Sequence, residues 1–226
     1  MNPDKKILYT QKLRDIQSKL PPETKLLIVS KTRSIEDIQL YYDLGQRDFG
    51  ENRVQELAMK ANALKESCPD IRWHMIGNLQ SNKLNQLFVI PGLWAIHSVD
   101  SLELLEKMVK SEHKLKSEVH LFFQVNTSHE EEKSGFESDS DLLGASKLIS
   151  SSAKLKLSGL MTMGTLRTEH FEAEATRCFK ELNQLKGQLE HACGLRLQTS
   201  MGMSQDYELA IEEKSHWIRL GTMMFQ

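Results

Sequence analysis

Eight short apolar segments recur along the chain, and a segment with helical character separates each from the next. Runs or alternations of apolar residues over about four to eight positions are typical of strands, and apolar spacings of three and four are typical of helices. The predicted strands cover residues 26–33, 47–50, 71–77, 93–99, 119–126, 155–163, 195–200 and 217–225. This α/β alternation favours a (β/α)8 barrel of the TIM type, while an open eight-stranded sheet remains the alternative.

One more helical segment precedes the first strand. Ile7, Leu8, Leu13 and Ile16 lie among charged residues at helical spacing, and the consecutive prolines at 21–22 end the pattern. The chain contains no low-complexity tract or linker that would divide it. We therefore expect one domain over residues 1–226, with residues 1–20 forming a leading helix packed on the barrel.

Composition excludes several classes of partner. The chain has 29 Lys and Arg against 31 Asp and Glu, a net charge of −2 that gives no general attraction to nucleic acid or anionic lipid. Its three cysteines lack the spacing of a disulfide framework or a zinc site, which favours a reducing compartment. No apolar run approaches the ~20 residues of a membrane span, and the N-terminus lacks a signal-peptide core. We expect a cytoplasmic protein with a small-molecule ligand, without nucleic acid, membrane or metal.

Lys31 follows the apolar run 26–29 at the point where the first strand ends. Ligands of such barrels bind at the carboxyl ends of the strands, so residues at strand ends are the candidates for chemistry. A desolvated lysine amine is a good Schiff-base nucleophile. The alternative from this segment alone is a lysine whose ammonium extends into solvent.

Two other strand ends carry turns suited to an anion. The seventh strand ends in Ser200, Gly202 and Ser204, and the eighth ends in a turn with Gly221 and Thr222. Such turns present several N–H groups, and the loops after strands seven and eight are the usual phosphate site of these barrels. With a lysine across the mouth, they indicate a phosphorylated carbonyl compound. Pyridoxal 5'-phosphate (PLP) and the phosphorylated sugar of a Schiff-base aldolase both fit.

An ordered set of short motifs runs from residue 26 to the end of the chain. The chain resembles the pyridoxal phosphate homeostasis protein family, whose fold is similar to the N-terminal barrel of alanine racemase. The matching segments are residues 29–32 (VSKT), 49–56 (FGENRVQE), 73–77 (WHMIG), 79–83 (LQSNK), 124–126 (QVN), 133–135 (KSG), 159–163 (GLMTM), 200–204 (SMGMS) and 219–222 (RLGT).

The resemblance implies a role for each matched residue at the mouth of the barrel. Lys31 would hold PLP as a covalent aldimine, and Arg219 would face the pyridine nitrogen. The phosphate would bind to Ser200, Gly202, Met203, Gly221 and Thr222. A cation at the ring nitrogen disfavours its protonation and makes the ring a weaker electron sink. The family is regarded as lacking robust enzyme activity and as acting in PLP homeostasis, storage or transfer, which makes apo PLP-dependent enzymes the expected partners.

Two segments depart from the family pattern. The usual pattern ends the last strand with Phe-Gly and a short basic tail, whereas this chain stops at Phe225-Gln226. Residues 163–167 (MGTLR) replace a loop that is richer in proline. Both segments are expected near the mouth, so they bear on access and loop motion more than on binding.

Two enzymatic alternatives share some of these features. A PLP-dependent amino-acid racemase needs a base on each face of the substrate, supplied in alanine racemase by a tyrosine of an additional domain. This chain ends with the barrel, which also favours a monomer, and its tyrosines at 9, 41, 42 and 207 fall in predicted helices. A Schiff-base aldolase places its lysine late in the barrel, whereas Lys31 is on the first strand.

Two further residues have open roles. Lys133 follows three glutamates in the loop after the fifth strand. It is either part of a solvated charge run or a second cation at the mouth that assists cofactor loading or release. His74 lies within the third predicted strand, where we expect a hydrogen-bonded core histidine and no catalytic role.

Overall fold

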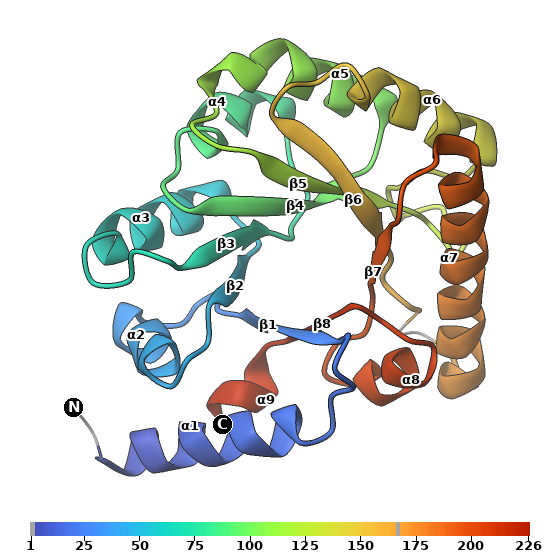
Figure 1. Cartoon of the computed structure of the whole chain (residues 1–226). Helices are drawn as coiled ribbons and strands as arrows, with labels where there is room; N and C mark the ends of the chain where they lie inside the picture. Colours follow the sequence, from blue (N-terminus) through green and yellow to red (C-terminus); the bar gives the residue numbers. More distant parts are fainter. Residues whose placement is uncertain (1–2, 166–167) are drawn as a thin grey trace.

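Eight parallel strands close into a barrel in the computed structural model, which describes residues 3–165 and 168–226. Each strand pairs with its neighbours in the chain, and β8 closes the barrel against β1 (Figure 1). The strands are β1 (Lys25–Val29), β2 (Asp48–Glu51), β3 (Arg72–Met75), β4 (Leu93–Val99), β5 (Val119–Gln124), β6 (Leu155–Met161), β7 (Gln198–Ser200) and β8 (Trp217–Leu220). The predicted (β/α)8 barrel is confirmed, and the open sheet is excluded.

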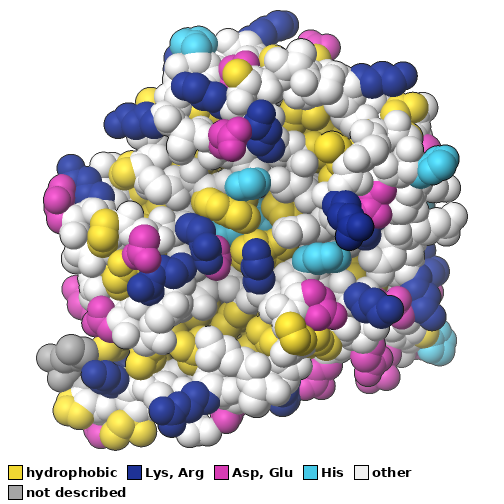
Figure 2. All heavy atoms as spheres, viewed as in Figure 1, with side chains coloured by type: hydrophobic (Ala, Val, Ile, Leu, Met, Phe, Trp, Pro, Cys, Tyr) yellow, Lys and Arg dark blue, Asp and Glu magenta, His cyan; other side chains and the backbone are white. Residues whose placement is uncertain are grey.

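Helices surround the barrel (Figure 1). They are α1 (Pro3–Gln17), α2 (Ile35–Asp43), α3 (Val54–Leu64), α4 (Leu84–Leu87), α5 (Leu102–Ser111), α6 (Asp139–Ile149), α7 (Phe171–Cys193), α8 (Tyr207–Glu212) and α9 (Thr222–Phe225), with 3-10 turns at Ser81–Lys83 and Glu112–Lys114. In the described ranges, none of the helices is long and apolar enough to span a bilayer. On the face drawn in Figure 2, basic and acidic side chains are interspersed, as on an ordinary solvated surface.

Alternation along each strand divides the core into two parts. Residues that face outward pack against the helices in one large apolar cluster. The inward-facing apolar residues form a separate small cluster of Leu27, Ala95, Phe122, Met161 and Trp217. Polar residues share the interior with them, because His74, His97 and Ser200 are also fully buried. The interior is therefore a packed core that also contains a row of buried polar side chains.

The end of the chain differs from the prediction. The last strand was expected to reach Phe225, but β8 stops at Leu220 and residues 222–225 form α9. The aromatic ring of Phe225 packs edge-on against Tyr9 of α1 and Tyr41 of α2, whose rings are stacked 4.6 Å apart. Burial in this cluster outside the barrel is available only if the chain turns after β8, and it outweighs the strand-like apolar pattern of this segment.

Two smaller differences have local causes. The seventh strand was expected from residue 195 but begins at Gln198, because Gly194 ends α7 in the left-handed conformation at φ 70° and the chain needs three residues to enter the barrel. The segment with helical character expected between the third and fourth strands forms a 3-10 turn followed by the short α4. Of the loop 163–167 that departs from the family pattern, Leu166 and Arg167 lie outside the described residues.

Candidate functional site

A cavity of about 490 Å³ opens at the carboxyl ends of the strands, a volume within the usual range for small-molecule sites. The predicted residues Lys31, Met203, Arg219, Gly221 and Thr222 line it. Its other lining residues are Val29, Asn52, Ile76, Gly77, Asn78, Gln124, Glu132, Lys133, Ser134, Met163 and Ser204. The fold thus brings residues from both ends of the sequence to one mouth.

Lys31 lies in the turn that follows β1, and its side chain is exposed to the cavity. In the described part of the chain, no hydrogen-bond or ion-pair partner faces its amine. The next residue, Thr32, has φ 63°, in the left-handed region that β-branched residues rarely adopt. A lysine without a partner at a ligand cavity is suited to reaction with a carbonyl group.

The turn after β7 is closely packed. Gly202 has φ 93°, and a Cβ added there would lie 2.5 Å from the Cβ of Ala210, so only glycine fits. The Met203 N–H donates to Asp206 Oδ1 at 2.5 Å, and Tyr207 N–H donates to the Met203 carbonyl at 2.9 Å. These contacts order the turn that carries Met203 and Ser204 into the cavity.

Arg219 lies beneath the cavity on the inward face of β8 and is 5% exposed. One terminal nitrogen donates to Ser200 Oγ at 2.7 Å, and the other donates to the carbonyl of Thr162 at 2.9 Å. Burial lowers the pKa of Arg219 to about 10, against the opposing charge of Asp206, so the guanidinium stays charged at neutral pH. The predicted residue is therefore a fixed cation that is held by two partners.

Ser200 begins a buried chain of hydrogen bonds that the sequence did not predict. His97 Nδ1 lies 2.9 Å from Ser200 Oγ, and His97 Nε2 lies 3.0 Å from His74 Nδ1. His74 Nε2 then lies 3.1 Å from Asp48 Oδ1. Arg72 binds both oxygens of Asp48 at 2.7 and 2.6 Å. This row of hydrogen bonds runs from the start of β2 and β3 through the barrel to the floor of the cavity.

The donor and acceptor roles in this chain follow from its two ends. The Asp48 carboxylate only accepts, so a neutral His74 donates to it from Nε2 and accepts at Nδ1, and a neutral His97 accepts at Nδ1 from the Ser200 hydroxyl, which itself accepts from Arg219. His97 then carries its proton on Nε2 and donates to His74, which in turn donates from Nε2 to the Asp48 carboxylate. Every bond is satisfied when both histidines are neutral.

The pKa shifts agree with that assignment. Burial lowers the pKa of His74 and lowers that of His97 well below its ordinary value. Burial alone would raise the pKa of Asp48, but its hydrogen bonds and ion pairs with His74 and Arg72 bring it below its ordinary value. The expectation for His74, a hydrogen-bonded core histidine, is confirmed.

Lys133 lines the same cavity because its loop is folded back onto β5. The side-chain amide of Asn126 donates to the carbonyls of Glu130 and Lys133, and that of Gln124 donates to the carbonyl of Ser134. The Lys133 amine contacts Glu130 Oε1 at 2.8 Å and the carbonyl of Gly164 at 3.3 Å. These contacts link the loops after β5 and β6 across one side of the mouth.

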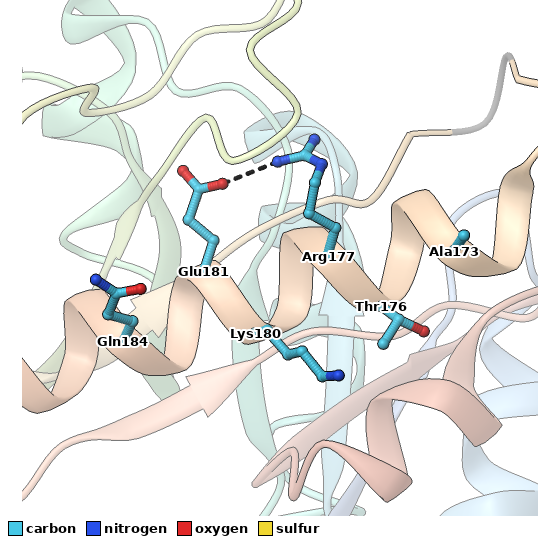
Figure 3. A pocket seen from close by; sticks show the side chains of 6 residues that line it. All are labelled: Ala173, Thr176, Arg177, Lys180, Glu181 and Gln184. Atoms are coloured by element: carbon cyan, nitrogen blue, oxygen red, sulfur yellow. Dashed lines mark hydrogen bonds and ion pairs between the residues drawn. The ribbon is translucent and has the colours of Figure 1, made fainter.

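A second hollow lies along one face of α7 (Figure 3). All its lining residues belong to that helix, and Arg177 and Glu181 pair across one turn at 2.9 Å while Lys180 points the other way. A groove formed by one helix face offers few converging polar groups. The cavity at the strand ends is therefore the candidate site.

Sequence reasoning missed Asp48, His97 and Asp206 as contributors to this site. His97 and His74 both sit within strand segments that were recognised, so the available clue was an inward-facing histidine on adjacent strands. Asp206 lies in a predicted loop and shows its role only through the Met203 N–H that it binds.

Residues 9–226 match the family model of the alanine racemase N-terminal domain. Alanine racemase of Clostridium difficile 630 shares the fold, with a TM-score of 0.78 at 14% identity over 99% of this chain and 57% of that one. The barrel and the lysine at its mouth thus define a protein of the alanine racemase N-terminal-domain class.

More similar proteins narrow this class. A pyridoxal phosphate homeostasis protein of Helicobacter pylori (strain J99) is 40% identical over 203 residues, covering 89% of this chain and 87% of that protein. PipY of Synechococcus elongatus PCC7942, solved without PLP, has a TM-score of 0.88 at 35% identity, covering 96% of this chain and 100% of that one. Its structure with PLP bound gives 0.86 at 34% identity. The chain belongs to the pyridoxal phosphate homeostasis protein family.

Proposed function

We propose that this protein binds PLP at the mouth of the barrel, with Lys31 as the covalent attachment point. The observation that carries the proposal is the Lys31 amine, which has no partner among residues 3–165 and 168–226, in a cavity that also contains Arg219 and the turns after β7 and β8. The amine nitrogen would add to the aldehyde carbon, and the aldehyde oxygen would leave as water, which gives a Schiff base. The relationship to PipY, whose structure with PLP bound is known, supports the same ligand.

The phosphate would bind to the turns after β7 and β8. The predicted groups are Ser200, Gly202, Met203, Gly221 and Thr222. Glycine at 202 and 221 lets the backbone approach an anion closely. The Ser200 hydroxyl already bonds to Arg219 and His97, and the Met203 N–H already bonds to Asp206, so a phosphate at either group would exchange an existing contact for a new one.

Arg219 would set the chemistry of the bound ring. A guanidinium has no proton acceptor, so it cannot stabilise a protonated pyridine nitrogen. PLP draws electrons best from a reacting carbon when that nitrogen is protonated. We therefore propose that the protein holds PLP for homeostasis, storage or transfer and has no robust catalytic activity.

The racemase alternative needs a second base, and the tyrosines do not supply it. All four tyrosines lie in described helices, and none of them lines the cavity. Tyr9 donates to Asp37 at 2.8 Å, Tyr207 donates to Glu208 at 2.8 Å, and Tyr41 donates to the carbonyl of Met224. Formation of D-alanine at about 1 per second or faster, a rate typical of enzymes, would contradict the proposal.

Absorbance spectroscopy tests the attachment. Purified protein mixed with PLP should gain the visible band of a Schiff base, and Lys31→Ala should lose it. Lys107→Ala is the matched control, because Lys107 is an exposed lysine of α5 paired with Glu103. An unchanged band in Lys31→Ala, or no band in the parent protein, would refute covalent attachment at Lys31. The aldolase alternative predicts no PLP band.

Transfer is tested by mixing the loaded protein with an apo PLP-dependent enzyme in the presence of a trap for free PLP. If transfer is direct, the loaded protein should activate the enzyme even when the trap is present. Free PLP should not activate the enzyme under the same conditions. We also propose that Lys133 assists loading or release, since its amine lies at the cavity. Unchanged transfer rates in Lys133→Ala would remove that role.

The three free cysteines support the proposed cytoplasmic location, and light scattering would test the proposed monomer.

A further inference from the structure

Lys60 of α3 is a buried lysine directly behind the turn that carries Lys31. It is 1% exposed, and its amine lies 2.7 Å from the Ser30 carbonyl, 2.8 Å from Glu51 Oε1 and 2.6 Å from Glu56 Oε1. Three oxygens thus match the three protons of the ammonium. The Lys60 cluster, defined as Lys60, Glu51 and Glu56, satisfies the whole ammonium group, while Glu51 Oε2 is buried without a hydrogen-bond partner among the described residues.

The same cluster holds the backbone on both sides of Lys31. Lys60 binds the carbonyl of Ser30, and Glu56 Oε1 accepts from the Thr32 N–H at 2.7 Å. The Ser30 hydroxyl donates to Glu51 Oε1 at 2.6 Å. The residue that follows Lys31 is therefore fixed in the left-handed conformation, which a threonine does not adopt by preference.

Stability alone is a poor explanation for such a network. Burying a lysine and a glutamate costs desolvation energy that their attraction barely repays, and apolar replacements are often neutral or stabilising. Burial raises the pKa of Glu51, against the contacts with Lys60 and Ser30 that lower it. The cluster instead acts on one particular turn, and that turn carries the residue proposed to bind PLP.

The Lys31 side chain has no partner of its own in the described part of the chain, so its position depends on its backbone. We propose that Lys60, with Glu51 and Glu56, is a positioning residue that holds Lys31 for addition to the aldehyde of PLP. Misplacement of a reacting group by about 1 Å can slow a reaction by about a hundredfold. This inference rests on the proposed function.

Two probes separate positioning from binding. PLP has an aldehyde that reacts with Lys31, whereas pyridoxine 5'-phosphate has the same ring and phosphate with a hydroxymethyl group in its place. In Lys60→Met, the rate of Schiff-base formation with PLP should fall about tenfold or more, while the affinity for pyridoxine 5'-phosphate stays within about twofold. Lys107→Met, in the exposed Lys107–Glu103 pair at 2.6 Å, is the matched control and should change neither value.

Variants at Glu56 make the test independent of the folding of Lys60→Met, because Glu56 is partly exposed. Glu56→Gln keeps an oxygen for the Thr32 N–H and should retain the rate within about threefold. Glu56→Ala removes that oxygen and should slow Schiff-base formation about tenfold, again with little change for pyridoxine 5'-phosphate.

Parallel losses with both probes would show a purely structural role and would overturn the proposal, as would unchanged rates in Glu56→Ala. Failure of the proposed function has a different signature, because the parent protein itself would then form no Schiff base with PLP.

Discussion

Arg219 donates to the hydroxyl of Ser200 at 2.7 Å, and the two residues are 5% and 0% exposed. Because Asp48 is a carboxylate that only accepts and both histidines are neutral, each group in the row donates toward Asp48, and Ser200 gives its own proton to His97. The cation at the floor of the cavity is thus held in place by residues that themselves lie outside the cavity. Changes to these buried residues should therefore affect the barrel interior.

Replacing His97 by phenylalanine should destabilise the fold. The ring of His97 stacks on Phe122 at 4.2 Å, so phenylalanine keeps the packing but removes one of the two buried hydrogen bonds of Ser200 and one of the two of His74. Each buried group that loses a hydrogen bond costs about 1–3 kcal/mol, so urea unfolding should show a loss of about 2–6 kcal/mol for the two groups.

The control for this variant is His120→Phe. His120 is only half-buried and bonds to Ser158 at 2.8 Å, outside the chain to Arg219. Its replacement should cost less than about 1 kcal/mol. Equal losses in the two variants would contradict a special role for the buried chain.

Stability should decrease as the solution becomes acidic. His74 and His97 have pKa values below the ordinary value of about 6.5, so the unfolded chain binds more protons than the folded one at pH values below about 6.5. The free energy of unfolding therefore falls as the pH drops from about 7 toward 5. Asp48, whose pKa is also lowered, adds a further loss below about 4.

Chemical denaturation at several pH values measures this dependence. His97→Phe removes one of the two titrating groups, so its free energy of unfolding should vary less with pH between about 7 and 5 than that of the parent protein. Identical slopes would mean that His97 is not held neutral by the fold.

Gly202→Ala should be strongly destabilising. Its φ of 93° is unfavourable for alanine, and the new Cβ would lie 2.5 Å from Ala210. Strain and overpacking together cost about 2–4 kcal/mol in thermal or urea unfolding. Gly187→Ala in α7 is the matched control, since nothing lies within 4 Å of its Cβ position, and it should stabilise the helix by up to about 1 kcal/mol. A tolerated alanine at 202 would show that this turn rearranges easily.

Asp206→Asn should increase the affinity for pyridoxine 5'-phosphate by about twofold to fivefold at neutral pH. The carboxyl is 2% exposed, its Oδ2 has no hydrogen-bond partner among the described residues, and burial raises its pKa against the opposing Met203 N–H and Arg219. Removing the negative charge lessens repulsion of a phosphate at the turn, and the amide oxygen can still accept from Met203.

Titration calorimetry at about pH 6 and pH 8 checks this prediction. The gain in affinity should not be larger at the lower pH, because burial raises the pKa of Asp206 and any protonation removes the same negative charge. Weaker binding by Asp206→Asn at both values would show that the carboxylate is needed to order the turn and does not oppose the anion.

Local patterns in the sequence were sufficient to predict the barrel and to place Lys31 after the first strand. Strand and helix periodicity depends on neighbours a few residues apart, and a closed barrel buries the outward faces of all eight strands against helices. The same patterns left the end of the chain open, because apolar residues 223–225 suit a strand as well as a helix. These residues form the helix α9 and not a strand because Phe225 packs against Tyr9 and Tyr41.

Only the tertiary structure decided which side chains meet inside the barrel. The bonds from Asp48 to His74, His97, Ser200 and Arg219 join residues 26, 23, 103 and 19 positions apart. Lys60 reaches the turn of Lys31 in the same way, although it is 30 positions away from Ser30. Such contacts depend on strand register and barrel closure, which arise from the whole fold and not from any one segment. The sequence by itself determined the barrel and the lysine, and the closed barrel determined which groups contact the turn of that lysine and the arginine on the neighbouring strand.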